Sequence, residues 1–186
     1  MNSKDSKSIT LLANPSKGTW FRYGIRYLFI GASTKSAAAF FLVPFMAIWS
    51  AGSISSIYGK QIVNNYFDPI LSLFGLPFLA ASLFFGFLAA MTIAGKVEVK
   101  LDKHGGEVFT GIGKIGLKKK FNWEEIRFVR LDTNKTNSRG YAMKNIVLTG
   151  KREISFGSGL SDSRRQFIYE ALKQLLERKR NGENIY

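Results

Sequence analysis

"FFGFLAAMTIAGKVEVKLDKHGGEVFTG", residues 84–111, changes character at one point. Up to Gly95 nearly every side chain is apolar, and from Lys96 onward apolar and polar residues alternate. The first pattern is typical of a helix surrounded by hydrocarbon, and the second is typical of a strand with one buried face. The junction therefore predicts a membrane segment followed directly by a sheet that folds in water.

Two stretches of the chain, residues 36–59 and 69–95, contain no Asp, Glu, Lys, Arg or His. A helix over the second would reach about 40 Å, which exceeds the hydrocarbon layer of about 30 Å. The first is more polar in its second half, which leaves a re-entrant segment as an alternative to a full span. We favour two spanning helices, at about 36–59 and 69–95, which form a transmembrane hairpin over residues 36–95.

The segments before and after this hairpin carry most of the charged residues of the 186-residue chain, whose net charge is +14. Residues 1–35 hold six basic and one acidic side chain, and residues 96–186 hold 20 basic and 11 acidic ones. Lys and Arg near spans stay on the cytoplasmic side, so both termini are expected in the cytoplasm of a multi-pass protein of the cell inner membrane. Thirty-five residues are too long for the charged region of a cleaved signal peptide.

Composition also excludes several classes of function. The chain has no cysteine, so disulfides, thiolate catalysis and thiolate metal sites are excluded. Its pI of about 10.1 would suit a protein that binds nucleic acid. Beside a membrane, we attribute the positive charge to the positive-inside rule and to attraction by anionic headgroups. We therefore expect no nucleic acid partner.

The basic segment 1–35 contains "GTWFRYGIRYLFIG", residues 18–31, in which Trp20, Arg22 and Arg26 alternate with apolar residues. That period is typical of a strand. Aromatic and arginine side chains also suit the membrane interface, and we slightly favour this second interpretation, without deciding between helix and strand. The expected interfacial anchors are Trp20, Arg22, Tyr23, Arg26 and Tyr27.

Within the hairpin, "FLVPFMA" (residues 41–47) and "FGLPFLA" (74–80) share Phe, Pro, Phe and Ala at equal spacing. Paired proline-interrupted segments are found in transporters with inverted repeats, but neither span holds an ionisable residue for an ion pathway. We therefore favour two kinked helices that pack together. Small residues recur every fourth position, at Ala47, Ala51 and Ser55 and at Gly86, Ala90 and Ala94, and suit hairpin closure or a homo-oligomer.

The segment 96–180 predicts a small sheet domain followed by a tail, residues 181–186. Strands are expected from Lys96 and near 107–113, 115–123, 126–132, 144–150 and 152–157, broken by a polar cluster at 134–140. Ser161 or Ser163 can cap a final helix, and Ser163 with Gln166 matches the capping box. Its apolar face is predicted to be Phe167, Ile168, Ala171, Leu172, Leu175 and Leu176.

Four segments follow one another in the chain: the hydrophobic hairpin, "GKVEVKLDKHGGEVFTG", "FNWEEIRFVRL" and "IVLTGKREISFGSGLSDSRRQFIYEALKQLL". In the order of these segments, the chain resembles bacterial membrane proteins with a pleckstrin-homology-like domain. The resemblance covers residues 30–180 and rests on order and pattern. It implies an α+β membrane protein whose bent sheet or small barrel is capped by the C-terminal amphipathic helix. That fold normally has seven strands. Six are recognisable here, and the alternating segment around Tyr23 is a candidate for another.

Three patterns that suggest chemistry have simpler interpretations. Residues 111–116 match G-x-G-x-x-G, but no helix follows them, so a glycine-rich hairpin is expected. His104 is the only histidine, so a metal site lacks a second one, and we expect it in a solvated turn. Glu124 and Glu125 are adjacent and expected to point to different sides, unlike a catalytic acid–base pair. We predict no catalytic set, no cofactor and no metal.

The one basic cluster followed by aromatics is Lys118, Lys119 and Lys120, ahead of Phe121 and Trp123. A strand edge protected by lysine is the simpler interpretation, and contact with anionic lipid or an acidic partner is the functional one. The residues expected to bind lipid or a partner are Lys118, Lys119, Lys120, Arg127, Arg130, Arg164 and Arg165. The leading hypothesis is a non-enzymatic scaffold that binds anionic lipid or a protein partner at the cytoplasmic leaflet, and the alternative is a subunit of an oligomeric pore or transporter.

Overall fold

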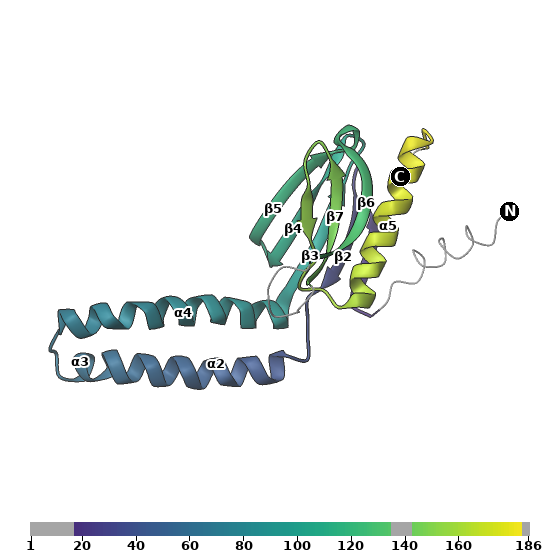
Figure 1. The fold of residues 1–186 in the computed structure, drawn as a ribbon. Coiled ribbons are helices and arrows are strands. Elements are labelled where there is room, and N and C mark those ends of the chain that lie inside the picture. The colour runs from purple at the N-terminus through teal and green to yellow at the C-terminus, as the bar shows by residue number, and fades with distance from the viewer. Residues whose placement is uncertain (1–16, 135–142, 184–186) are drawn as a thin grey trace. The chain divides into compact units, whose positions relative to one another are not determined.

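A computed structural model describes residues 17–134 and 143–183, which form an α+β protein with two long apolar helices and antiparallel sheets (Figure 1). The chain divides into a helical unit, Lys35–Ala94, and a sheet unit built from the segments before and after it. The helical unit is thus an insertion within the sheet unit's sequence.

The helical unit contains two long helices. The first runs without a break from Ala39 to Val63 and comprises α2 (Ala39–Ile54), the π-helix η1 (Ser55–Gly59) and α3 (Lys60–Val63); the second is α4 (Pro69–Ala94). Both are long and apolar enough to cross a membrane. The first begins three residues later and ends four residues later than the expected range 36–59.

A polar network joins the two helices near the turn between them. Gln61 Oε1 accepts hydrogen bonds from Asp68 N (3.0 Å) and Ser72 Oγ (2.9 Å), and Tyr58 Oη donates to Ser72 O (3.0 Å). Asp68 Oδ1 accepts from the first free backbone N–H groups of α4, which is how an N-cap stabilises a helix start. Gly75 packs against the Tyr58 ring, since a Cβ there would lie 2.4 Å from Tyr58 Oη.

The described residues of the sheet unit form eight strands in two antiparallel sheets. The first has the order β1-β2-β3-β4-β5 and the second the order β6-β7-β8. Their bounds are β1 Thr19–Tyr23, β2 Leu28–Ser33, β3 Gly95–Leu101, β4 Gly105–Ile112, β5 Ile115–Asn122, β6 Ile126–Asn134, β7 Met143–Gly150 and β8 Ile154–Phe156. The six strands expected after Gly95 are all present.

The described part of segment 1–35 is not separate from this domain. Its alternating residues form β1 and β2, and β2 pairs with β3 along its whole length. Leu28, Ile30 and Ala32 are fully buried in the core that they share with the later strands. The two-residue period of residues 18–31 thus reflects strands. The sheet unit begins in this segment and continues after the helical unit, at Gly95.

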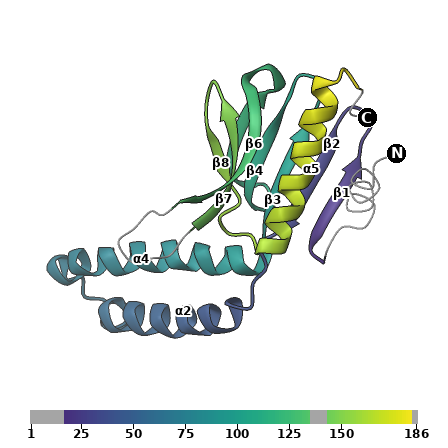
Figure 2. The ribbon, with the colours of Figure 1, turned by 45° about the vertical axis from the view of Figure 1, so that its right-hand side comes forward.

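A final helix, α5 (Asp162–Arg180), packs against β2 of the first sheet and β6 of the second (Figure 2). All six residues of its predicted apolar face are buried. The capping box at Ser163 is wrong, because the helix begins at Asp162, its N-cap is Ser161, and no side chain caps it. Instead the side chain of Arg165 organises this end of the helix, as described below.

Candidate functional site

Charged side chains gather on one face of the first sheet, which we call the outer sheet face. It consists of the side chains of β2–β5 that alternate with the buried ones and so point away from the core. They are Phe29, Lys96, Glu98, Lys100, Glu107, Phe109, Lys118 and Lys120, of which Phe109 is itself buried by its neighbours on this face.

The strand register aligns these side chains in rows. One row runs Phe29, Lys100, Glu107 and Lys120, and the next places Glu98 opposite Phe109, which is opposite Lys118. Directly opposed side chains have Cβ atoms about 5 Å apart, so each row is a line of contacts. Four lysines thus share this face with two glutamates.

Ion pairs and aromatic rings hold the lysines in place. Glu107 contacts Lys118 at 3.4 Å and Lys120 at 3.9 Å, and Lys96 contacts Glu98 at 3.3 Å. The Lys100 ammonium lies 3.6 Å from the centre of the Tyr27 ring, a cation–π contact. Since one carboxylate serves two lysines here, positive charge remains in excess on this face.

A hollow of about 280 Å³ is open on the same face. Four lysines and two phenylalanines line it, together with two glutamates and the turn after β4. The lining residues include Phe29, Lys96, Lys100, Phe109, Lys114 and Lys118. Such a surface suits an anionic group whose charge lysines neutralise while apolar atoms rest on the rings.

The predicted binding residues belong to three elements, β5, β6 and α5, and do not form one surface. Lys118 and Lys120 belong to the outer sheet face, whereas Lys119 points to the other side of β5 and donates to Ser155 O of β8 at 2.9 Å. Lys119 therefore links the edge of the first sheet to the second.

The arginines of β6 lie on the second sheet. Arg130 forms ion pairs with Glu153 at 3.0 Å and Asp132 at 3.5 Å, and Arg127 is exposed. Arg130 is therefore largely neutralised by its neighbours within the domain.

Arg165 is not a surface ligand, contrary to the prediction. Only 6% of it is exposed, and its guanidinium donates to Gly157 O, Leu160 O and Asp162 Oδ1. The adjacent Arg164 donates to Lys17 O and Ser33 O at the edge of the first sheet. Both side chains fasten the start of α5 to the rest of the domain.

The expected interfacial anchors lie on or beside β1 and β2. The Trp20 ring covers Gly31, where an added Cβ would lie 2.3 Å from it. Tyr23, Arg26 and Tyr27 lie at the β1–β2 turn, one strand length from Ser33, where the chain leaves for the helical unit. Six strand residues span about 20 Å, so connectivity alone does not bring these three near the hairpin.

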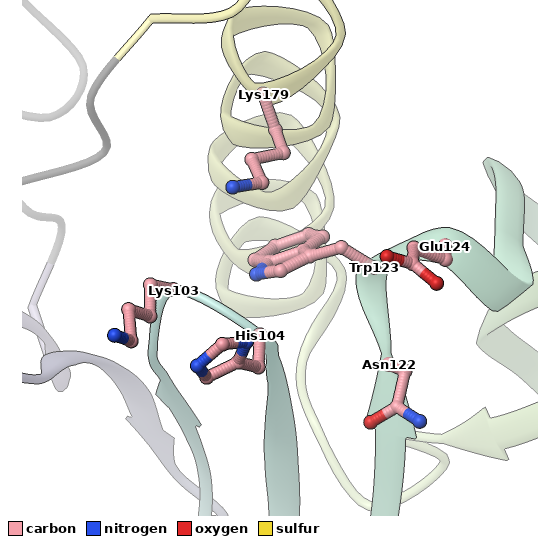
Figure 3. A pocket seen from close by; sticks show the side chains of 6 residues that line it. All are labelled: Lys103, His104, Asn122, Trp123, Glu124 and Lys179. Carbon is pink, nitrogen blue, oxygen red and sulfur yellow. The ribbon is translucent and has the colours of Figure 1, made fainter.

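A second hollow, of about 450 Å³, lies at the β3–β4 turn and the start of η2 (Trp123–Glu125) (Figure 3). Trp123 forms one wall, and its Nε1 donates to Asp102 O at 2.8 Å. Lys103 and Lys179 come from different elements. In the view, exposed His104 lies beside Lys103, and the Trp123 ring lies between His104 and Lys179. Within the described residues, no group of three His, Asp or Glu side chains could hold a metal ion.

Sequence reasoning missed Lys96, Lys100, Phe29 and Phe109 as members of one surface. The signal was present in the two-residue period of 96–101, which assigns Lys96, Glu98 and Lys100 to the polar side of their strand. The pairing of that strand with residues 28–33 could not be inferred from the period. The register therefore decides which charges meet.

These features define an α+β protein with two long apolar helices and a lysine-rich outer sheet face. No protein-family model matches the sequence, and a search of curated proteins finds no match to it.

Proposed function

We propose that the chain is an integral membrane, non-enzymatic binding protein that presents a pleckstrin-like domain to anionic lipid headgroups at the cytoplasmic leaflet. The observation that carries this proposal is the apolar surface of the hairpin. Only 6% and 11% of the most apolar parts of the two helices are buried, whereas a core helix of a soluble protein is mostly buried. Large exposed side chains such as Phe40, Phe41, Phe74 and Phe84 would be stable in hydrocarbon.

The topology supports two crossings. Because β2 and β3 pair in one sheet, the segments before and after the hairpin must lie on the same side of a membrane. If α4 crosses, the helix from Ala39 to Val63 must cross as well, since a re-entrant first segment would leave β2 and β3 on opposite sides. The excess of Lys and Arg outside the hairpin favours the cytoplasmic side.

Two antiparallel sheets closed by a C-terminal helix support the pleckstrin-like assignment. The strand count is eight rather than seven, with β1 as an additional edge of the first sheet. The outer sheet face provides the lipid contact in this proposal. Each basic residue near an anionic leaflet contributes about 1 kcal/mol, and tethering removes most of the search for the surface.

The test uses the full chain in nanodiscs of neutral or anionic lipid. Acetylation of lysines followed by mass spectrometry measures how accessible each ammonium group is. We expect Lys96, Lys100, Lys118 and Lys120 to react several-fold more slowly in anionic nanodiscs, and high salt to remove the difference. Lys173, exposed on α5, is the matched control. Equal rates in both lipids would exclude the headgroup contact, and extraction by alkaline carbonate would exclude integration.

A further inference from the structure

The β4–β5 hairpin ends in aliphatic side chains that the sheet unit leaves uncovered. Ile115 is 77% exposed and Leu117 is 73% exposed. Both follow a two-residue turn, Gly113-Lys114, in which Gly113 takes a φ of 57° that β-branched residues resist. We call residues 112–118 the hairpin tip.

These two side chains point to the side of the sheet on which the core lies. Strand alternation places Ile115 and Leu117 on the same side as Phe121, which is 4% exposed. Phe121 belongs to the buried core, where its ring contacts that of Trp123, whereas the first six residues of β5 are exposed. An edge strand that exposes aliphatic residues normally marks an interaction site or an aggregation hazard.

The tip lies at the end of the sheet from which the chain leaves for the apolar helices. Ile112 is paired with Gly95 and Gly111 with Lys96, and Lys96 is paired with Ser33. Thr34 and Gly95, the last and first residues of the sheet unit at the two junctions, are joined by a backbone hydrogen bond of 2.9 Å. Covalent connectivity thus attaches this end of the sheet to both apolar helices.

The tip itself carries only basic charged residues, and the acidic residue nearest to them is Glu107, which is ion-paired with Lys118 across the strands. Residues 108–120 contain four lysines and no acidic residue, and Lys114 and Lys118 flank the aliphatic pair. Aliphatic side chains bordered by lysine fit the boundary between acyl chains and anionic phosphate groups. An acidic protein groove would match the lysines, but it would not account for the position of the tip at the junctions with the apolar helices.

We propose that the hairpin tip inserts Ile115 and Leu117 into the headgroup–acyl boundary of the membrane that the protein's own helices span, with Lys114 and Lys118 at the phosphates. This inference rests on the proposed membrane integration and names a second point of contact. The tip then adds to the attachment made by the two helices and restrains the orientation of the domain.

The absence of cysteine in the chain allows a direct test. Ile115→Cys and, as a matched control, Asn122→Cys at the other end of the same strand are each labelled with an environment-sensitive fluorophore in the full chain. Both variants are reconstituted into anionic vesicles, with or without lipids that carry a nitroxide near the headgroup end of the acyl chain. We expect nitroxide lipids to quench the label at 115 at least twofold more than the label at 122, and aqueous iodide to show the reverse order.

Two outcomes overturn the inference while leaving integration intact. Efficient iodide quenching at 115 would place the tip in water, and protection from both quenchers would place it against protein. Integration is measured on the same samples by flotation after alkaline extraction, so its failure is distinguishable. Replacing Leu117 with Ser in the labelled Ile115→Cys variant is expected to reduce the nitroxide quenching, because the remaining aliphatic anchor is lost.

Discussion

Ser33 and Lys96 are Cα partners on neighbouring antiparallel strands, although residues 34–95 lie between them in the sequence. The apolar hairpin therefore occupies the place of a β-turn between β2 and β3. The two strands on either side of it share one core, in which Leu28 packs on the same face as Leu101, its partner across the strands. The domain is complete only when both flanks of the hairpin are present.

Removal of the hairpin should give a soluble domain. Joining Thr34 to Gly95 through Asn-Gly replaces the insertion by the two-residue turn that antiparallel neighbours favour. We expect a monodisperse protein with β-sheet circular dichroism and a cooperative unfolding transition. A matched chain of residues 96–186 lacks Leu28, Ile30 and Ala32, all fully buried, and should aggregate. Folding of the shorter chain with equal stability would contradict the shared core.

Arg165→Ala should destabilise the sheet domain by about 2–3 kcal/mol, because it leaves the carbonyls of Gly157 and Leu160 without their charged donor. Arg178→Ala is the matched control on the same helix. That side chain is 42% exposed and its ion pair with Glu183 is 4.0 Å long, so its loss should cost no more than about 0.5 kcal/mol. Denaturant unfolding of the hairpin-deleted domain measures both, and equal effects would contradict the structural role of Arg165.

Asp162 should contribute to an acid transition. A hydrogen bond from Lys144, with a further one from Arg165, lowers the pKa of Asp162 below its ordinary value of 3.8. A carboxylate whose pKa is lowered by folding stabilises the protein above its unfolded pKa, and this contribution is lost as the pH falls through the folded value. Asp162→Asn should therefore flatten the fall in melting temperature below about pH 4. If the melting temperature of this variant fell as steeply with pH as that of the unmodified protein, Asp162 would not contribute to the acid transition.

Gly75→Ala should loosen the helical hairpin. The new Cβ would lie 2.4 Å from Tyr58 Oη, so the ring must move and its hydrogen bond to Ser72 O is lost. Overpacking of this kind costs about 1–3 kcal/mol. Gly86→Ala in the same helix meets no atom within 4 Å and should be neutral or slightly stabilising. Unfolding of the full chain in detergent compares them, and rescue by Tyr58→Ala would identify the steric cause.

Local periodicity predicted the local structure well. The apolar face of α5 and all six strands after Gly95 follow from the 3.6-residue and two-residue repeats. The glycine-rich segment 111–116 is a hairpin as expected, with Gly111 paired to Gly116. The pairing of β2 with β3 was not predicted, because a repeat says nothing about which distant strand supplies the partner.

The candidate binding residues were harder to predict for the same reason. Arg165 reads as a surface cation in the sequence, but three acceptors near the start of α5 surround it in the fold. Lys118 and Lys119 are neighbours in sequence and point to opposite sides of β5. Residue type gives the charge, whereas register and tertiary contacts decide where that charge is available.

The interrupted sheet imposes an order on biosynthesis. When β2 leaves the ribosome, its partner β3 has not been made, and the intervening residues require about 3–12 s at ordinary elongation rates. During that interval the edge of β2 that pairs with β3 has no native partner, and Leu28 and Ile30 lack the part of the core that the later strands supply. Completion of the domain must therefore wait until both apolar helices have been synthesised.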